Sequence, residues 1–300
     1  MRASSYLLLL IAGLFFLFQM AGFKVMPPVS SLISLVAMLA FAAYFKVSAR
    51  STESRVGENR GGGFFNVLLP LGLAFSTMNL VVAFSSISLV DGLNGTLIWA
   101  WSPMVVGVSA YIVFQNSSKQ ETLSLAGVKW FGVVLALVMM GLVALSGNSG
   151  VFLNGSAFLC IGALSLAAVL SNFGPRTVGK GFGVLFQGET GVDDIREAAG
   201  MFSFLERTVV ASGLAGAGIG VVMVLKTWGV PSDLGPGLSL ILLSVLYAYG
   251  LAVTFRLMGM TCQSRSNGAL LQFDAMLPVS SLAVCPLFVF VILAVQLHLA

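Results

Sequence analysis

Charged residues are scarce in this 300-residue chain, which is 9% Asp, Glu, Lys and Arg and 58% hydrophobic. Soluble domains carry about 25% charged residues, and a soluble fold of this composition could not cover its surface with polar groups. The low charge therefore predicts an integral membrane protein. The net charge of +4 forms no basic patch interleaved with exposed aromatic residues, so nucleic acid is not an expected partner.

Histidine and cysteine are also scarce, with one histidine, His298, and three cysteines. Cys160, Cys262 and Cys285 lack metal-ligand spacing and sit in or beside apolar runs, so we expect buried thiols rather than disulfides or a metal site. A single histidine near the end of the chain cannot build a multi-histidine zinc site or support a Ser/His mechanism. We therefore expect no enzyme activity, no metal and no cofactor.

Long apolar runs take the place of the missing charge. A run of about 20 residues can cross the hydrocarbon core as a helix, which predicts nine transmembrane helices, or ten if one run has been missed. The runs cover residues 4–25, 29–48, 64–87, 92–114, 124–146, 151–173, 206–227, 236–258 and 268–297. Backbone groups that face lipid must be paired within the segment, so the expected fold is all-α and polytopic. The first run is expected to be a retained helix rather than a signal peptide.

Basic residues divide unequally between the two sides of such a fold. Of the 15 Lys and Arg residues, all but Lys24 and Lys226 lie on one side when the N-terminus is placed there. Basic loops stay in the cytoplasm, which predicts a cytoplasmic N-terminus and an external C-terminus. The plasma (inner) membrane is taken as the default location. The longest inner loop is predicted to hold a short interfacial helix, which begins at a capping box of Asp194 and Glu197 and leads into the seventh span.

Two segments of the chain repeat one pattern. Asn79 to Pro103 and Gly250 to Pro278 each contain a helix ending in Phe, a polar stretch, Asn-Gly and an apolar helix with a central proline. An odd number of spans separates the copies, so they insert in opposite directions, as in the inverted repeats of many secondary transporters. The predicted units are residues 1–148, with five helices, and residues 149–300, which lack the last helix and carry a cytoplasmic insert at 174–205.

The stretch from Phe84 to Ser146 resembles the EamA type of the drug/metabolite transporter superfamily. It has a third helix running into a polar turn, a fourth helix with central Pro103, and a Gly- and Val-rich fifth helix starting near residue 125. Segments 151–176 and 238–290 resemble the second half. The resemblance implies two inverted repeats of five helices, ten spans, cytoplasmic termini and movement of small metabolites. The chain departs from the family in its nine spans and in the long connection after the sixth.

A carboxylate at mid-membrane costs about 2.5–3.5 kcal/mol and usually serves a function. Asp274 in the ninth predicted span is therefore a candidate for binding a substrate amine or carrying a proton. The alternative is a structural carboxyl group near the inner surface, neutral or paired with Arg256 or Arg265. Arg256 itself is otherwise expected to extend to the lipid headgroups.

Other polar and aromatic residues inside the spans are candidates for lining a cavity. Trp side chains prefer the ends of spans, whereas Trp99 and Trp101 lie mid-span near Pro103, which suggests a stacking or gating surface that exposes at most one of them. The further cavity candidates are Gln19, Thr77, Asn79, Asn172, Tyr247, Tyr249 and Gln272. Some of these are expected to form hydrogen bonds between helices instead.

These features predict a secondary transporter, a permease or exporter of small organic metabolites, that works by alternating access. The two repeats would enclose a polar cavity, and Pro103 and Pro278 would loosen the fourth and ninth helices as gates. Protons are a candidate coupling ion, and the oligomeric state is left open. One alternative is a non-transporting or degenerate membrane subunit. Another is a membrane-embedded lipid-modifying enzyme, for which Asp193, Asp194 and Glu197 supply only one of two acidic clusters.

Overall fold

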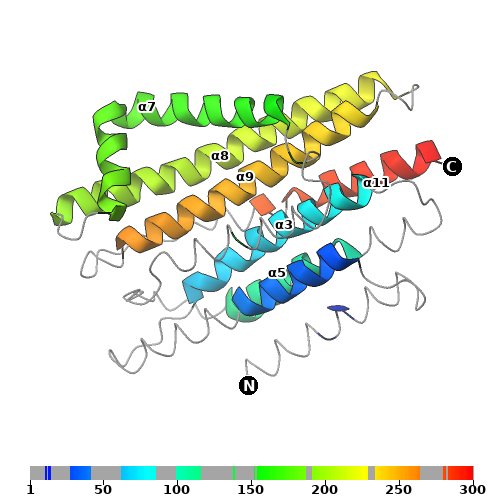
Figure 1. Cartoon of the computed structure of the whole chain (residues 1–300), viewed down its shortest axis with the longest axis horizontal. Helices are drawn as coiled ribbons and strands as arrows, with labels where there is room; N and C mark the ends of the chain where they lie inside the picture. Colours follow the sequence, from blue (N-terminus) through cyan, green and yellow to red (C-terminus); the bar gives the residue numbers. More distant parts are fainter. Residues whose placement is uncertain are drawn as a thin grey trace.

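The computed structural model describes residues 11, 13–14, 28–41, 62–85, 99–115, 138, 152, 154–186, 191–228, 234–263, 280–281 and 283–299. Its elements are α3 (Gly62–Ser85), α5 (Ser102–Gln115), α7 (Gly155–Phe186), α8 (Val192–Lys226), α9 (Leu234–Gln263) and α11 (Cys285–Leu299). A shorter apolar helix covers Val29–Phe41. All regular structure in the described ranges is helical, which confirms the predicted all-α class (Figure 1).

Four of the described helices, α3, α7, α8 and α9, are long and apolar enough to cross a membrane. They correspond to the third, sixth, seventh and eighth predicted spans. The larger count of nine is not confirmed, because several predicted spans lie wholly or partly outside the described residues. The proposed boundary between the repeats, at residues 148 and 149, also lies outside them.

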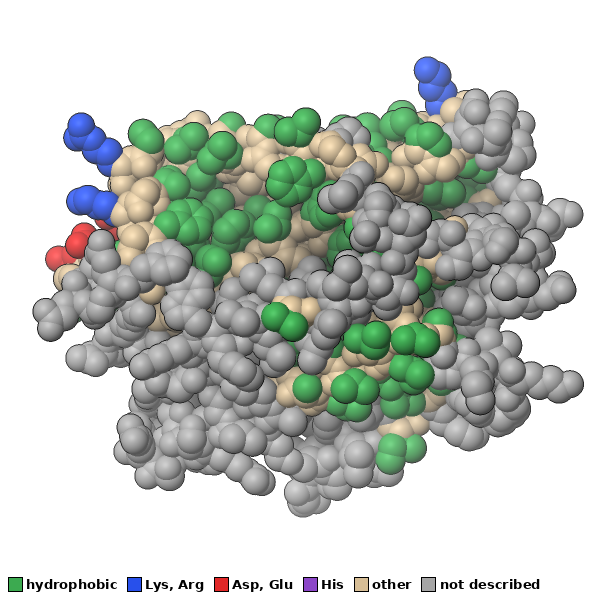
Figure 2. All heavy atoms as spheres, in the orientation of Figure 1, with side chains coloured by type: hydrophobic (Ala, Val, Ile, Leu, Met, Phe, Trp, Pro, Cys, Tyr) green, Lys and Arg blue, Asp and Glu red, His purple; other side chains and the backbone are tan. Residues whose placement is uncertain are grey.

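Apolar side chains cover much of the outer surface of the helices. Leu159 on α7 is 68% exposed, Val222 on α8 is 65% exposed and Val36 on the Val29–Phe41 helix is 61% exposed. Figure 2 shows such side chains over the upper part of the visible face and in a smaller patch below it, with the coloured charged groups at the two ends of the upper part. An apolar surface of this kind is stable against lipid tails and not against water. The protein is therefore embedded in a membrane.

Glycine residues bring α8 and α9 into close contact. A Cβ atom at Gly216 would lie 2.6 Å from Ser244 Oγ, and one at Gly220 would lie 2.9 Å from the carbonyl oxygen of Gly237. Any larger residue would push the helices apart. Small residues at such interfaces are the usual basis of helix packing in lipid, where apolar burial alone gives little driving force. The two helices consequently form one tightly packed pair.

The pair α3 and α5 is built in the same way. A Cβ atom at Gly72 would lie 2.7 Å from the carbonyl oxygen of Pro103, and one at Gly107 would lie 2.7 Å from that of Leu68. The contacts run in opposite directions along the two helices, so α3 and α5 are antiparallel. This second close pair belongs to the first half of the chain, whereas α8 and α9 belong to the second.

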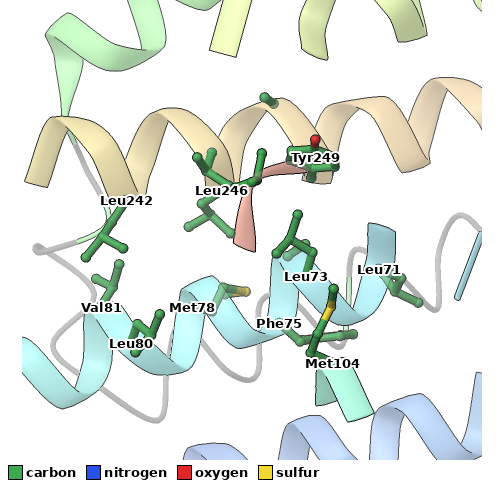
Figure 3. Packing of buried hydrophobic residues seen from close by; sticks show 14 of the residues in the cluster. Leu71, Leu73, Phe75, Met78, Leu80, Val81, Met104, Leu242, Leu246 and Tyr249 are labelled. Atoms are coloured by element: carbon green, nitrogen blue, oxygen red, sulfur yellow. The ribbon is translucent and has the colours of Figure 1, made fainter. Parts of the chain in front are cut away.

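Aliphatic side chains fill the contact between α3 and α9, which we call the α3–α9 seam. In Figure 3, Leu242 lies opposite Val81 and Leu246 lies opposite Met78, so the two helices run antiparallel. Opposite directions are what an inverted repeat requires of the third and eighth spans. The expected polar cavity between the halves does not lie along this seam, because its side chains pack as a closed apolar core.

Helix α7 changes direction at Gly174, which has φ 72° and ψ 159° and is followed by Pro175. Proline cannot donate the helical hydrogen bond, and this backbone conformation is essentially restricted to glycine. Beyond the kink, residues 175–186 run across the other helices (Figure 1); we call them the α7 arm. Gly181, Val184 and Leu185 of the arm are buried in a second apolar cluster with α8 and α9.

The start of α8 corrects the prediction of a separate interfacial helix before the seventh span. Residues 192–205 continue without a break into the rest of α8. The N-cap is Gly191 and makes no side-chain capping bond, so the predicted capping box is wrong, and Asp194 lies in the first turn. The sequence pattern located helical structure in the 174–205 insert but placed the change of direction at the wrong end of it.

Candidate functional site

The fourth predicted span is interrupted next to Pro103. Trp99 is helical, Ala100 and Trp101 form a turn, and α5 begins at Ser102 with Pro103 in its second position. Proline lacks the N–H that would bond to the carbonyl group four residues earlier. The interruption therefore lies beside Pro103, the proline that the sequence analysis expected to loosen this helix.

The ninth predicted span has a matching interruption, at Pro286. Val284 forms a turn, and α11 begins at Cys285, directly before that proline. The Val284 carbonyl accepts a hydrogen bond from Leu287 N at 3.0 Å, which is the tighter i to i−3 spacing. Pro278, the predicted gate, lies outside the described residues. Both α5 and α11 begin with a small residue and proline (Ser-Pro and Cys-Pro), a signal that the sequence analysis missed.

An aromatic contact joins the two interrupted helices. The rings of Trp101 and Phe288 meet edge to face, with centroids 5.4 Å apart and planes at 86°. Trp101 is half-buried and Trp99 is buried. Of the two predicted tryptophans, Trp101 thus connects the first half of the chain to the second.

Buried polar groups gather beside the interruption in the fourth span. The backbone N–H of Met104 donates to Ser76 Oγ at 3.2 Å, and Ser34 Oγ lies 3.1 Å from Asn79 Oδ1. All of these side chains are buried, and Asn79 is only 2% exposed. We call Ser34, Ser76 and Asn79, with the Met104 amide, the kink site. Of these residues, the sequence analysis had named only Asn79.

One atom of the Asn79 amide group is unsatisfied. Its Nδ2 has no hydrogen-bond partner among the described residues, and the same holds for Ser31 Oγ, three residues before Ser34, and for Ser102 Oγ, two residues before Met104. An unsatisfied buried polar group costs about 1–3 kcal/mol. Polar groups retained at such a cost inside a membrane usually serve binding or transport. The kink site can therefore offer hydrogen bonds to a polar solute.

Tyr249 lies at a second buried polar position. It is fully buried on α9, and its hydroxyl group lies beside Ser280 and Ser281, just before α11. The interruption in each half thus has a polar side chain of a neighbouring helix, α3 or α9, close to it. Ser280 and Ser281 were not predicted, since apolar residues surround them in sequence.

Three further predicted cavity residues form hydrogen bonds elsewhere. Tyr247 bonds through its hydroxyl group to the Phe152 carbonyl and to the backbone N–H of Asn154, which connects α9 to the start of α7. Thr77 Oγ1 donates to the Leu73 carbonyl within α3 at 2.7 Å. Asn172 is exposed on α7 and bonds to Ala168 of its own helix. Gln19, Gln272 and Asp274 lie outside the described residues.

An ion pair inside the protein also corrects a prediction. Arg256 Nη1 lies 3.2 Å from Glu206 Oε1, and the side chains are 3% and 10% exposed. Arg256 therefore does not extend to the headgroups. The sequence analysis began the seventh span at Glu206 and treated that residue as a boundary position. Nothing local to α8 signals a partner that lies 50 residues away.

The pair lies on the membrane side of the α7 kink. The Phe204 ring packs against Phe173, the residue just before Gly174, with centroids 5.5 Å apart. Glu206 is two residues further along α8, which is about 3 Å toward the membrane centre at 1.5 Å rise per residue. The carboxylate and the guanidinium are thus within the span and shielded from lipid by protein.

No protein-family model, curated protein or solved structure matches this chain. Among the described residues, no group of three or more His, Cys, Asp or Glu side chains could hold a metal ion. The functional argument accordingly rests on the kink site and on the packing of the helices around it.

Proposed function

We propose that the protein is a secondary transporter of small organic solutes. The observation that carries the proposal is the kink site, where a proline-interrupted helix lies beside an unsatisfied buried amide. Interrupted helices inside a membrane are tolerated where they line a cavity, and transporters bind solutes and ions at them. The Trp101–Phe288 contact supports coupling between this site and the second half of the chain.

Helix packing supports a mechanism in which one part of the protein moves against another. Pairs α3–α5 and α8–α9 are each held together by glycine contacts that a small displacement would break. The α3–α9 seam between them consists of aliphatic side chains, which can slide and repack without breaking hydrogen bonds. In this proposal the pairs move as units and the interruptions bend. Asp274 remains the candidate proton carrier.

Charge placement supports the proposed orientation. Arg176 and Lys180 are exposed on the α7 arm, and Lys226 is exposed at the opposite end of α8. The visible basic groups accordingly separate to the two ends of the helices (Figure 2). Because positive loops stay inside, the end with the arm would face the cytoplasm of a plasma (inner) membrane, and the N-terminus would lie on that side.

An uptake screen in proteoliposomes tests the function. Purified protein is reconstituted and offered a mixture of amino acids, amines, sugars, nucleosides and organic acids, and the trapped solutes are identified by mass spectrometry. We expect at least one solute to accumulate above protein-free liposomes. Asn79→Leu should reduce its uptake at least tenfold, and Thr77→Val, which alters a hydroxyl bonded within α3, should not. Folded wild-type protein that moves none of these solutes would refute the proposal.

A non-transporting membrane subunit is the second candidate, and the closed α3–α9 seam favours it. Cysteines introduced at Met78 and Leu246, which face each other in Figure 3, can be cross-linked to lock the seam. A transporter should lose uptake when the seam is locked and regain it after reduction. The cross-link should leave a scaffold protein unaffected in its association with partners.

A further inference from the structure

The orientation of the Asn79 amide follows from the hydrogen bonds of Ser34. Ser34 Oγ lies 2.8 Å from the Ser30 carbonyl oxygen and 3.1 Å from Asn79 Oδ1. Both of those atoms are acceptors, but a serine hydroxyl group has only one hydrogen. Ser34 can therefore donate to just one of them.

The Ser30 carbonyl is the better acceptor for that hydrogen. The contact is shorter, and a serine inside a helix commonly donates to the carbonyl group four residues earlier. Ser34 then presents a lone pair to Asn79. The amide is satisfied on that side when its Nδ2 faces Ser34, an orientation reached by a 180° rotation about the Cβ–Cγ bond of Asn79. In this orientation the carbonyl oxygen Oδ1 takes the place where Nδ2 had no hydrogen-bond partner. The unsatisfied atom of Asn79 is then an acceptor.

Helix register places this unpaired position about one turn beyond the turn that precedes α5. Gly72 of α3 lies against Pro103 and Met104. Because α3 and α5 run antiparallel, Ser76, four residues further along α3, is level with about four residues earlier, at Trp99 and Ala100, where the fourth span is interrupted. Asn79 lies three residues beyond Ser76, about 4.5 Å further along α3.

We propose that Asn79 Oδ1 is a hydrogen-bond acceptor for an N–H or O–H group of the solute, and that Ser34 is the positioning residue that orients it. The proposal rests on the proposed transport function and specifies its substrate class as solutes that carry a hydroxyl or amino hydrogen. A solute without such a hydrogen would leave the buried acceptor unsatisfied. That loss corresponds to a roughly fivefold to hundredfold difference in affinity.

Paired probes, in which a methyl group replaces every donor hydrogen of one partner, test the assignment. The probes are ethanolamine against choline methyl ether, and myo-inositol against its hexa-O-methyl ether, at millimolar concentration. Binding to the purified full-length protein in detergent is measured by saturation-transfer NMR. We expect at least one donor-bearing probe to bind wild type at least fivefold more tightly than its methylated partner. Equal binding of the partners, or no binding of either donor-bearing probe, overturns the proposal.

Variants separate the roles of the two residues. Asn79→Leu and Asn79→Ala should lose the donor-bearing probe. Ser34→Ala leaves the Asn79 amide free to rotate, so this variant should still bind the probes but no longer prefer the donor-bearing one over its methylated partner. Thr77→Val should behave as wild type. Each variant must keep the wild-type melting temperature. If both Asn79 variants bind the donor-bearing probe as wild type does, the assignment of Asn79 is wrong.

The same measurements distinguish failure of the site from failure of the function. Asn79-dependent binding of a donor-bearing probe, with no solute crossing the proteoliposome membrane, would overturn transport and leave the acceptor site standing. Transport that is equally fast for methylated and donor-bearing solutes would overturn the acceptor assignment and leave transport standing.

Discussion

Replacing Arg256 with methionine should destabilise the protein strongly, since it leaves the Glu206 carboxylate inside the helix bundle without the guanidinium. At the observed 3.2 Å separation, an effective dielectric constant of 20 gives an attraction of about 5 kcal/mol. Desolvation of both groups offsets much of this in the intact pair, but the carboxylate keeps its desolvation cost when the arginine is gone. We therefore expect Arg256→Met to cost about 3–5 kcal/mol.

The double variant Arg256→Met with Glu206→Leu should recover most of that loss. It removes both charges and leaves apolar side chains of similar size, an exchange that is often neutral or stabilising. Its stability is expected within about 1 kcal/mol of wild type. A large single effect together with a small double effect is the signature of a buried carboxylate that has lost the guanidinium from its surroundings.

Equilibrium unfolding in mixed micelles with increasing SDS, followed by circular dichroism, measures these differences. Arg196→Met is the control, because Arg196 is exposed on α8, the helix that carries Glu206, and it should change stability by about 0.5 kcal/mol or less. The reasoning fails if Arg256→Met is no more destabilising than Arg196→Met. It also fails if the double variant is as unstable as the single one.

Three further predictions concern glycines and topology. Gly213→Ala should lower the free energy of unfolding by about 1–3 kcal/mol, because its Cβ would lie 2.1 Å from Ala248 Cβ. The control Gly218→Ala places its Cβ in open space and should leave that free energy unchanged. SDS unfolding measures both. Gly174→Ala must adopt φ 72° and ψ 159°, at a cost of about 1–3 kcal/mol, and should make the α7 arm more sensitive to limited trypsin digestion; equal digestion rates would contradict the strained kink. In intact cells an impermeant maleimide should label Lys226→Cys but not Lys180→Cys, and the reverse pattern would invert the proposed orientation.

Composition and periodicity were sufficient to predict the class of the fold and several of its elements. The third, sixth, seventh and eighth predicted spans correspond to helices long enough to cross a membrane. Pro103 marked the region of the fourth span where the structure has a turn at Ala100 and Trp101; its role as a gate stays a prediction. These predictions succeeded because they depend on local properties: the apolar length that lipid requires and the missing N–H of proline.

The candidate site was predicted only in part. Asn79, Trp101 and Tyr249 were named in advance, but Ser34, Ser76 and the serines near Tyr249 were not. Serines are frequent in apolar helices, and their own carbonyl groups can satisfy them, so sequence alone does not show which ones face a neighbouring helix. The α7 kink was missed as well, because Gly174-Pro175 looked like the end of a span rather than a bend within one helix.

The sequence by itself determined that this chain is embedded in a membrane as helices, because the backbone N–H and C=O groups of such apolar runs must be paired within each segment when they face hydrocarbon. The tertiary structure alone decided which polar groups meet. Ser34 and Asn79 are 45 residues apart, and Glu206 and Arg256 are 50 apart. Their pairing depends on the rotation and register of whole helices, which are set by the close glycine contacts between neighbouring helices and not by any local pattern.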